Sequence, residues 1–293
     1  MRPPKVADSI LLGDARELSA TLPAEIVDCI VTSPPYFGHR KYSGEAEELE
    51  LGRERKPDAY VERLVSYFAA FRRLLKPSAS VWLNLGDTYR SGQLLGIPWR
   101  VALALQDDGW LLRSDVIWHK PNAMPSSVKN RPTTDHEYIF LLTTGADYHY
   151  DIDAIREPHV TFSERSRMRG GRGHLGKRGG TPEEGKNSGD HNLHDARWDQ
   201  AFHPKGRNKR TVWSVPLGKF REAHFAVFNE ELIEPCIKAG CPEGGLVLDP
   251  FMGAGTTALV ARRLDRRYLG FELVPRYAQL AEERLATSVR NAA

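Results

Sequence analysis

Short apolar runs alternate along this chain with longer segments in which apolar residues recur at helical spacing. The short runs predict buried strands, and the longer segments predict amphipathic helices. The predicted strands are Ser9–Leu12, Ile26–Thr32, Ser80–Leu85, Ser114–Trp118, Glu137–Thr143, Leu246–Asp249 and Arg267–Phe271. The predicted helices are Asp58–Leu75, Gly96–Gln106, Asn229–Ala239, Thr256–Leu264 and Pro275–Thr287. Strands that alternate with helices indicate an α/β fold, in which helices cover both faces of a mostly parallel sheet.

One segment, residues 159–210, interrupts this alternation. It has no apolar periodicity, and it contains nine glycines and 12 Lys/Arg against six Asp/Glu. A loop of this length is uncommon in a compact domain unless it is functional or disordered. We therefore interpret it as an insertion on the functional face of one α/β domain, whose two parts are residues 1–158 and 211–293.

The rest of the composition is ordinary for a cytoplasmic protein. The formal net charge is only +3, so the basic character is concentrated in the insertion. The three cysteines, Cys29, Cys236 and Cys241, form no CxxC pair, which predicts reduced thiols and no metal site. We expect Cys29, within a strand pattern, to be a small core residue. No apolar run approaches the ~20 residues that span a bilayer, so we predict no membrane association.

The segment Asp249–Thr257 carries a glycine-containing loop between a predicted strand and a predicted helix. Glycines such as Gly253 and Gly255 permit positive φ and let a ligand approach the backbone closely, and the N–H groups of the helix start favour an anionic group. A P-loop is excluded because no Lys follows the second glycine, and the third glycine of a dinucleotide loop is absent. Glu272 ends the next strand, where an acidic residue suits ribose hydroxyls. The alternative is a simple strand-to-helix turn.

A second loop, Thr32–Tyr36, follows the apolar run Ile26–Val31 and reads Thr-Ser-Pro-Pro-Tyr. Consecutive prolines hold the chain extended and remove two N–H donors, so the local carbonyls serve as acceptors. Such a loop suits a site that binds an amino group on a flat ring, such as that of a nucleobase. An aromatic amine is a poor nucleophile because its lone pair is delocalised, and acceptors on its hydrogens make it more reactive. We predict that the Ser33 hydroxyl and the Pro34 carbonyl are these acceptors and that Tyr36 stacks on the nucleobase. The alternative is a rigid turn with a core tyrosine.

Together the two loops resemble those of the amino-directed DNA methyltransferases of the β class, which use S-adenosyl-L-methionine. The catalytic loop of this family lies near the N-terminus, followed by a target-recognition insertion and then by the cofactor loop. The resemblance covers nearly the whole chain. It implies a Rossmann-like fold with a circularly permuted motif order, and a mostly parallel seven-stranded sheet with an antiparallel edge strand. It also implies that the target base is flipped out of duplex DNA.

The resemblance assigns roles to particular residues. The catalytic residues are Ser33, Pro34, Pro35 and Tyr36. The cofactor-binding residues are Asp14, Ala15, Asp249, Pro250, Phe251, Gly253, Gly255, Thr256, Thr257 and Glu272. The expected DNA-binding residues match no family motif and are chosen for their basic character: His39, Arg40, Lys41, Arg165, Arg167, Arg169, Arg172, Lys177 and Arg178. For those of the insertion, the alternative is a solvated basic loop that reads no sequence. Ile117–Asn122 resembles the segment that lines the base pocket, and Thr211–Phe228 resembles the segment that closes over the methionyl end.

Two smaller motifs are open to more than one interpretation. Asp87 could line the pocket, but a loop cap is the favoured interpretation. His119–Asn122 either contacts the base or a phosphate, or forms a satisfied loop.

The serine that opens the catalytic motif resembles the N4-cytosine members, whereas N6-adenine members usually carry Asp there. We therefore interpret the chain as a DNA (cytosine-N4)-methyltransferase that acts on double-stranded DNA. The alternatives are an N6-adenine DNA methyltransferase, a methyltransferase of RNA or protein glutamine, a catalytically silent DNA-binding relative and a nucleotide-binding oxidoreductase. The motif order, the basic insertion and the intact Ser33 and Gly253 weigh against them. The resemblance leaves open a cognate restriction endonuclease and a homodimer.

Overall fold

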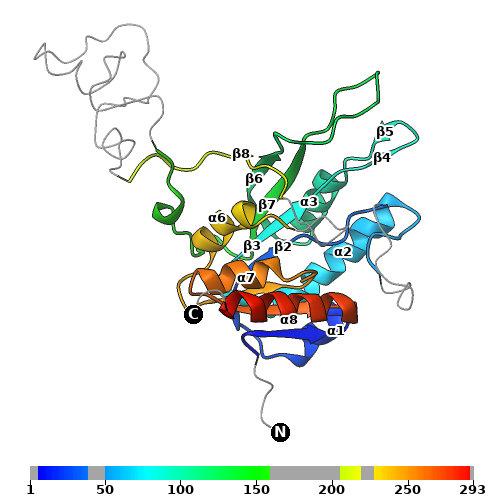
Figure 1. Cartoon of the computed structure of the whole chain (residues 1–293). Coiled ribbons are helices and arrows are strands. Elements are labelled where there is room, and N and C mark those ends of the chain that lie inside the picture. The colour runs from blue at the N-terminus through cyan, green and yellow to red at the C-terminus, as the bar shows by residue number, and fades with distance from the viewer. Residues whose placement is uncertain (1–5, 39–49, 159–204, 219–227, 291–293) are drawn as a thin grey trace, which may run out of the picture. The chain divides into compact units, whose positions relative to one another are not determined.

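The computed structural model describes residues 6–38, 50–158, 205–218 and 228–290 (Figure 1). The chain forms two compact units, residues 1–151 with 211–293 and residues 152–210. In the smaller unit the short helix η1 spans Asp153–Ile155. Glu157 and Arg207 pair there through two backbone hydrogen bonds of 2.9 and 2.8 Å, and the Glu157 carboxylate also binds Lys209 at 3.0 Å. The two described segments of the smaller unit are therefore held to each other.

The larger unit is built on an eight-stranded sheet in the order β1-β10-β9-β2-β3-β7-β6-β8. Its strands are β1 (Ser9–Leu12), β2 (Val27–Thr32), β3 (Leu75–Leu85), β6 (Leu111–His119), β7 (His136–Thr143), β8 (Val212–Ser214), β9 (Leu246–Asp249) and β10 (Arg267–Glu272). All neighbours are parallel except that β7 runs antiparallel to both β3 and β6. A separate hairpin pairs β4 (Tyr89–Arg90) with β5 (Gln93–Leu94).

Helices cover both faces of this sheet. They are α1 (Ala15–Thr21), α2 (Pro57–Arg72), α3 (Ile97–Asp107), α6 (Glu230–Gly240), α7 (Thr256–Arg263) and α8 (Pro275–Arg290). Alternate residues of a strand point to opposite faces. On β3, Val81 and Leu83 join the core formed with α2 and α3, whereas Ser80 and Trp82 lie against Gly240 at the end of α6. The predicted α/β fold with a mostly parallel sheet is confirmed.

Two details of the expected sheet differ. The sheet has eight strands rather than seven, because the three residues of β8 add to the edge of β6 and bury Trp213 with its ring 6.2 Å from that of Trp82. The antiparallel strand β7 lies inside the sheet, between β3 and β6, rather than at its edge. The predicted helix Asp58–Leu75 ends earlier, at Arg72, because Leu75 begins β3 and pairs with Val27.

The order of the strands places a switch point between β9 and β2. From β2 the chain passes through α2 to β3 on one side, and from β9 it passes through α7 to β10 on the other. Loops at the carboxyl ends of such strands separate and leave a crevice, which is the usual ligand site of open α/β sheets. The loops that follow β2 and β9 are the two that the sequence singles out.

The cysteines are part of the core. All three are buried and free of disulfides, which confirms the interpretation of Cys29 as a core residue. Burial raises the pKa of the Cys29 thiol well above its usual value and that of Cys241 to about 12. None of the helices within the described ranges has both the length and the apolar character needed to cross a lipid bilayer.

Gly255 provides a test of how closely α8 packs on the loop after β9. Its φ is +80°, and a Cβ there would lie 2.7 Å from the Cβ of Ala281. We expect Gly255→Ala to lower the free energy of unfolding by about 3 kcal/mol, because backbone strain and overpacking add. Gly92→Ala is the matched control, since its φ is +79° with nothing within 4 Å, and it should cost about 1 kcal/mol. Equal losses in urea unfolding would contradict the close contact with α8.

Candidate active site

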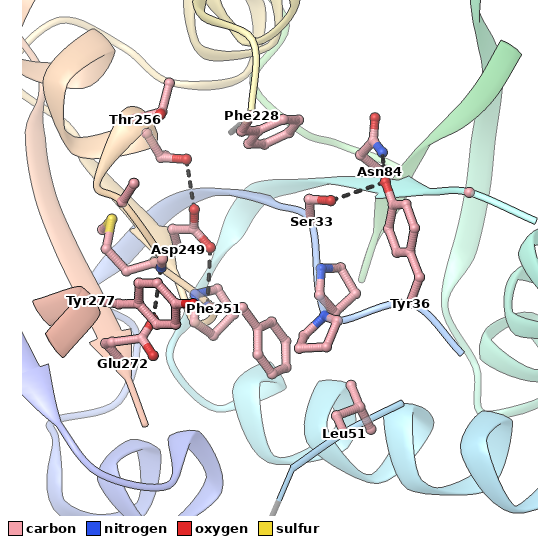
Figure 2. A pocket seen from close by; sticks show the side chains of 18 of the residues that line it. Ser33, Tyr36, Leu51, Asn84, Phe228, Asp249, Phe251, Thr256, Glu272 and Tyr277 are labelled. Atoms are coloured by element: carbon pink, nitrogen blue, oxygen red, sulfur yellow. Dashed lines mark hydrogen bonds between the residues drawn. The ribbon is translucent and has the colours of Figure 1, made fainter. Parts of the chain in front are cut away.

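A cavity of about 620 Å³ opens at the carboxyl ends of the central strands (Figure 2). The loop after β2 and the loop after β9 both line it, together with the ends of β1 and β10 and the adjoining parts of β6 and β7. The sequence-predicted residues that line it are Asp14, Ala15, Ser33, Pro34, Pro35, Tyr36, Asp249, Pro250, Phe251, Gly253, Thr256, Thr257 and Glu272. The fold therefore brings the two motifs into one cavity.

Asp249 connects the two loops. Its buried carboxylate accepts hydrogen bonds from the Thr32 hydroxyl at 2.6 Å, the Thr257 hydroxyl at 2.7 Å and the Phe251 N–H at 3.1 Å. Burial raises the pKa of this carboxyl to about 6, although all three donors favour its charged form. With both oxygens engaged, Asp249 ties the end of β2 to the start of α7.

Glu272 holds the other side of the glycine loop. Its carboxylate accepts from the Gly253 N–H at 2.7 Å and from the Val274 N–H at 2.9 Å, so it joins the loops that follow β9 and β10. Burial raises the pKa of this carboxyl above its ordinary value. Each oxygen keeps further acceptor capacity toward the cavity. Gly255 is placed differently from expectation, because it packs against Ala281 and is not part of the cavity lining.

Asp14 forms the N-cap of α1. Its carboxylate accepts from the Arg16 N–H at 2.9 Å and from the Tyr67 hydroxyl at 2.7 Å. Burial, followed by this hydrogen bond, raises the pKa of Tyr67 to about 12. The Tyr67 ring lies 5.5 Å from that of Phe251. Sequence reasoning missed Tyr67, because on α2 it is one of several buried aromatic residues at helical spacing.

The Tyr36 hydroxyl lies at the centre of a hydrogen-bonded cluster at the Ser33 end of the cavity. It donates to the Glu137 carboxylate at 2.7 Å. It accepts from the Ser33 hydroxyl at 3.1 Å and from the Asn84 amide, as Figure 2 shows. Burial, followed by the charge of Glu137, raises the pKa of Tyr36 well above its ordinary value. The Tyr36 ring packs on Gly86, where a Cβ would lie 2.7 Å from it.

Glu137 is a second residue that sequence reasoning missed. Besides Tyr36 it binds two more groups, because Oε2 also accepts from Asn84 Nδ2 at 2.7 Å and the Lys120 ammonium binds Oε1. That ammonium also lies 4.5 Å from the ring centroid of Trp118. Nothing in the sequence signals this role, since Glu137 falls within a predicted strand.

Contacts of the two smaller motifs bear on both of their interpretations. Asp87 accepts from the N–H groups of Thr88, Gly96 and Ile97 at 2.8 to 3.0 Å, as expected of a loop cap, and it also lines the cavity, so the two interpretations hold together. In the segment His119–Asn122, Asn122 exchanges hydrogen bonds with the backbone of Leu217, and Lys120 lines the cavity.

The predicted DNA-binding residues lie outside the described residues. These are His39, Arg40, Lys41, Arg165, Arg167, Arg169, Arg172, Lys177 and Arg178. The same is true of positions 219–227 of the segment expected to close over the methionyl end, whereas Leu217, Gly218 and Phe228 line the cavity.

Comparison with known proteins identifies the family. Residues 27–283 match a family model of DNA methylases that covers the N6 and N4 methyltransferases. The chain belongs to this family. The methylase is 38% identical to the type II methyltransferase M.SmaI of Serratia marcescens over 94% of this chain and 90% of that protein. It is 39% identical to M.Cfr9I of Citrobacter freundii over 93% and 86% of the two chains.

Solved structures share the fold. The cytosine-N4-specific PvuII DNA methyltransferase superposes with a TM-score of 0.66 at 21% identity, over 94% of the methylase and 85% of that chain. A putative DNA modification methylase of Thermus thermophilus, solved in complex with S-adenosyl-L-methionine, gives a TM-score of 0.59 at 29% identity, over 95% and 93%.

The raised pKa of Asp249 predicts how stability depends on pH. Between its ordinary 3.8 and about 6, the folded methylase retains a proton that the unfolded chain has lost. The contribution of the protonated Asp249 carboxyl to the free energy of unfolding is therefore fully present below pH ~4 and is lost as the pH rises through about 6. Relative to Asp249→Asn, the wild type should lose at most about 3 kcal/mol of unfolding free energy over this range. Urea unfolding of both proteins from pH 4 to 7 measures this, and a constant difference would contradict it.

Proposed function

We propose that the methylase transfers a methyl group from S-adenosyl-L-methionine to the N4 amine of a flipped-out cytosine in double-stranded DNA. The observation that carries this proposal is that the loop of Ser33 and the loop of Gly253 line one cavity and are joined by the Asp249 carboxylate. A cofactor at one loop would then lie beside an amine held at the other.

The cofactor end fits an adenosyl group. Glu272 presents buried carboxylate oxygens that can accept from ribose hydroxyls, and the rings of Phe251 and Tyr277 line the same part of the cavity (Figure 2). Asp14 and Ala15 belong to the wall at the end of β1. The residues to which we assign direct cofactor contacts are Asp14, Ala15, Pro250, Phe251, Gly253, Thr256, Glu272 and Tyr277. We assign a supporting role to Asp249, Gly255 and Thr257.

The catalytic end fits a planar amine. The bound cofactor supplies an electrophilic methyl group, so the protein needs to position the amine and to increase its nucleophilicity. Ser33 and Pro34 are the acceptors for the amine hydrogens, and Tyr36 is a wall of the base site. Positioning and fixed dipoles of this kind supply most of the rate in such a site.

Two observations favour cytosine as the target base. The residue that opens the catalytic loop is Ser33, and the PvuII enzyme with the same fold is cytosine-N4-specific. The M.SmaI and M.Cfr9I relatives are type II methyltransferases, which supports a place in a restriction-modification system. A cognate endonuclease, a homodimer and a cytoplasmic location remain predictions.

Ser33→Ala tests the assignment of the reaction. We expect N4-methylcytosine in the DNA of a methylation-free host that expresses the wild type, detected by mass spectrometry of nucleosides. Ser33→Ala should lower the rate of transfer by about 100-fold or more while cofactor binding survives, because it removes one fixed polar contact to the amine. Ser66→Ala is the matched control, since Ser66 is exposed on α2 and hydrogen bonds only locally to Arg63.

Three outcomes would count against the proposal. N6-methyladenine would overturn the choice of base, and the absence of any modified base would overturn the assignment of an active DNA methyltransferase. Undiminished transfer by Ser33→Ala would remove Ser33 from the catalytic site.

The basic insertion is tested through salt dependence. Replacement of Arg165, Arg167 and Arg169 by Ala should weaken DNA binding and reduce the slope of log K against log salt by up to about 3, because each phosphate contact contributes about 0.9. Arg263→Ala on α7, which removes ion pairs with Glu230 and Glu234, is the control. An unchanged slope in the triple variant would place these arginines outside the DNA interface.

A further inference from the structure

The hydrogen bonds around Tyr36 have a direction that chemistry alone determines. An ionised carboxylate only accepts, and the amide nitrogen of Asn84 only donates. Asn84 Nδ2 lies 2.7 Å from Glu137 Oε2 and also donates to the Tyr36 oxygen. The orientation of the Asn84 amide is therefore fixed, because its oxygen in that place would face a carboxylate.

The donors and acceptors around the Tyr36 hydroxyl also determine where its hydrogen points. Its one hydrogen goes to Glu137 Oε2 at 2.7 Å, and its two lone pairs receive hydrogens from Asn84 and Ser33. Lys120 occupies Glu137 Oε1, which leaves Oε2 to Tyr36 and Asn84. Every hydrogen-bonding site of the Tyr36 hydroxyl is then in use.

The orientation of the Ser33 hydroxyl follows from this arrangement. Its hydrogen points at Tyr36, over 3.1 Å, so the side of its oxygen that faces the cavity carries lone pairs (Figure 2). A hydroxyl free to rotate would spend part of its time donating into the cavity, where it would repel the hydrogens of an amine. The chain Ser33–Tyr36–Glu137 keeps it an acceptor.

We propose that Glu137 is a positioning residue which, through Tyr36, fixes Ser33 as the acceptor of the amine hydrogen and takes up the proton that the amine loses. This inference rests on the proposed function. As the new C–N bond forms and the C–S bond of the methyl donor breaks, an amine N–H bond breaks and its proton passes to Ser33. Ser33 passes its own proton to Tyr36, and Tyr36 passes its own to Glu137, which ends as a carboxylic acid and returns the proton to solvent.

Glu137→Gln separates this role from simple packing. The variant has the same shape, but Lys120 requires an oxygen beside it, so the amide NH₂ would face Tyr36 and Asn84. Tyr36 could no longer donate to residue 137, and the Asn84 amide would reverse to present its oxygen to the new NH₂. The hydrogens of Tyr36 and Ser33 would then no longer be held in one direction, and the chain of hydrogen bonds would have lost its final proton acceptor.

The test is single-turnover methyl transfer on duplex DNA with cofactor in excess. We expect Glu137→Gln to lower the rate constant by about 100-fold or more, which is the usual scale of positioned proton transfer. Cofactor and DNA dissociation constants should stay within about two-fold. Glu234→Gln is the matched control, because it also breaks an ion pair, with Lys238, but on α6 and outside the cavity lining.

A double-mutant cycle with Tyr36→Phe identifies the route of the effect. If Glu137 acts only through the Tyr36 hydroxyl, Tyr36→Phe with Glu137→Gln should be no slower than Tyr36→Phe alone. Multiplied effects would show that Glu137 acts on the base by another contact, and would overturn the proposal. An unchanged rate for Glu137→Gln would overturn it as well.

A second readout does not depend on activity. The ¹³C resonance of the Tyr36 ζ carbon, assigned by its loss in Tyr36→Phe, should shift in Glu137→Gln because the hydroxyl changes its hydrogen-bond partner. A fixed resonance would overturn the proposed polarity whether or not methyl transfer occurs. A shifted resonance in a protein that methylates no base would support the polarity and reject the proposed function.

Discussion

The buried carboxylate of Asp249 is the contact on which the candidate site depends. A charge removed from water is costly unless hydrogen bonds replace its hydration, and here two threonine hydroxyls and one N–H do so. The two hydroxyl donors are Thr32, at the start of the Ser-Pro-Pro-Tyr loop, and Thr257, at the end of the glycine-loop segment. Neither loop can shift without leaving that carboxylate short of a partner, so the distance between them is held by the fold.

The Ser33–Tyr36–Glu137 chain shows the same principle at the other end of the cavity. The Tyr36 hydroxyl uses its hydrogen and both lone pairs, and the direction of each of these hydrogen bonds follows from groups that only donate or only accept. The buried Asn84 Oδ1 has no hydrogen-bond partner among the described residues, so it is the Tyr36 hydroxyl, and not the whole network, that is fully satisfied and held in one arrangement. Through Tyr36, Glu137 and Lys120 thus determine that the Ser33 hydroxyl presents lone pairs to the cavity.

Much of the fold could be predicted because the strands are strongly apolar and regularly spaced. The bounds of β1 and β9 are those expected from the sequence. The predicted end of α2 is too late because Leu74 and Leu75 continue its apolar spacing, although Leu75 pairs in the sheet. The three residues of β8 are too short to show a pattern, and they form a strand through their pairing with β6.

The site was predictable where a motif is contiguous and hidden where it depends on pairing. Ser33 and Gly253 lie in loops whose composition is itself informative. Glu137 becomes part of the site only because β7 lies antiparallel beside β3. Tyr138 lies opposite Leu85 in that pair, and this register brings Glu137 close to Asn84. The strand pattern gives no sign of that register, since it depends on which strands become neighbours.

The pairing of β2 with β9 also bears on how the protein is made. Cys29 and Val247 are partners in that pair, so the centre of the sheet joins segments that are far apart in the sequence. Contacts so distant in sequence slow folding, because a large loop must close before they contribute. As the ribosome releases the chain from its N-terminus, the Ser-Pro-Pro-Tyr segment emerges long before the strand that completes its surroundings. A nascent chain that ends before β9 therefore displays this segment without the residues after β9 and β10 that complete the cavity.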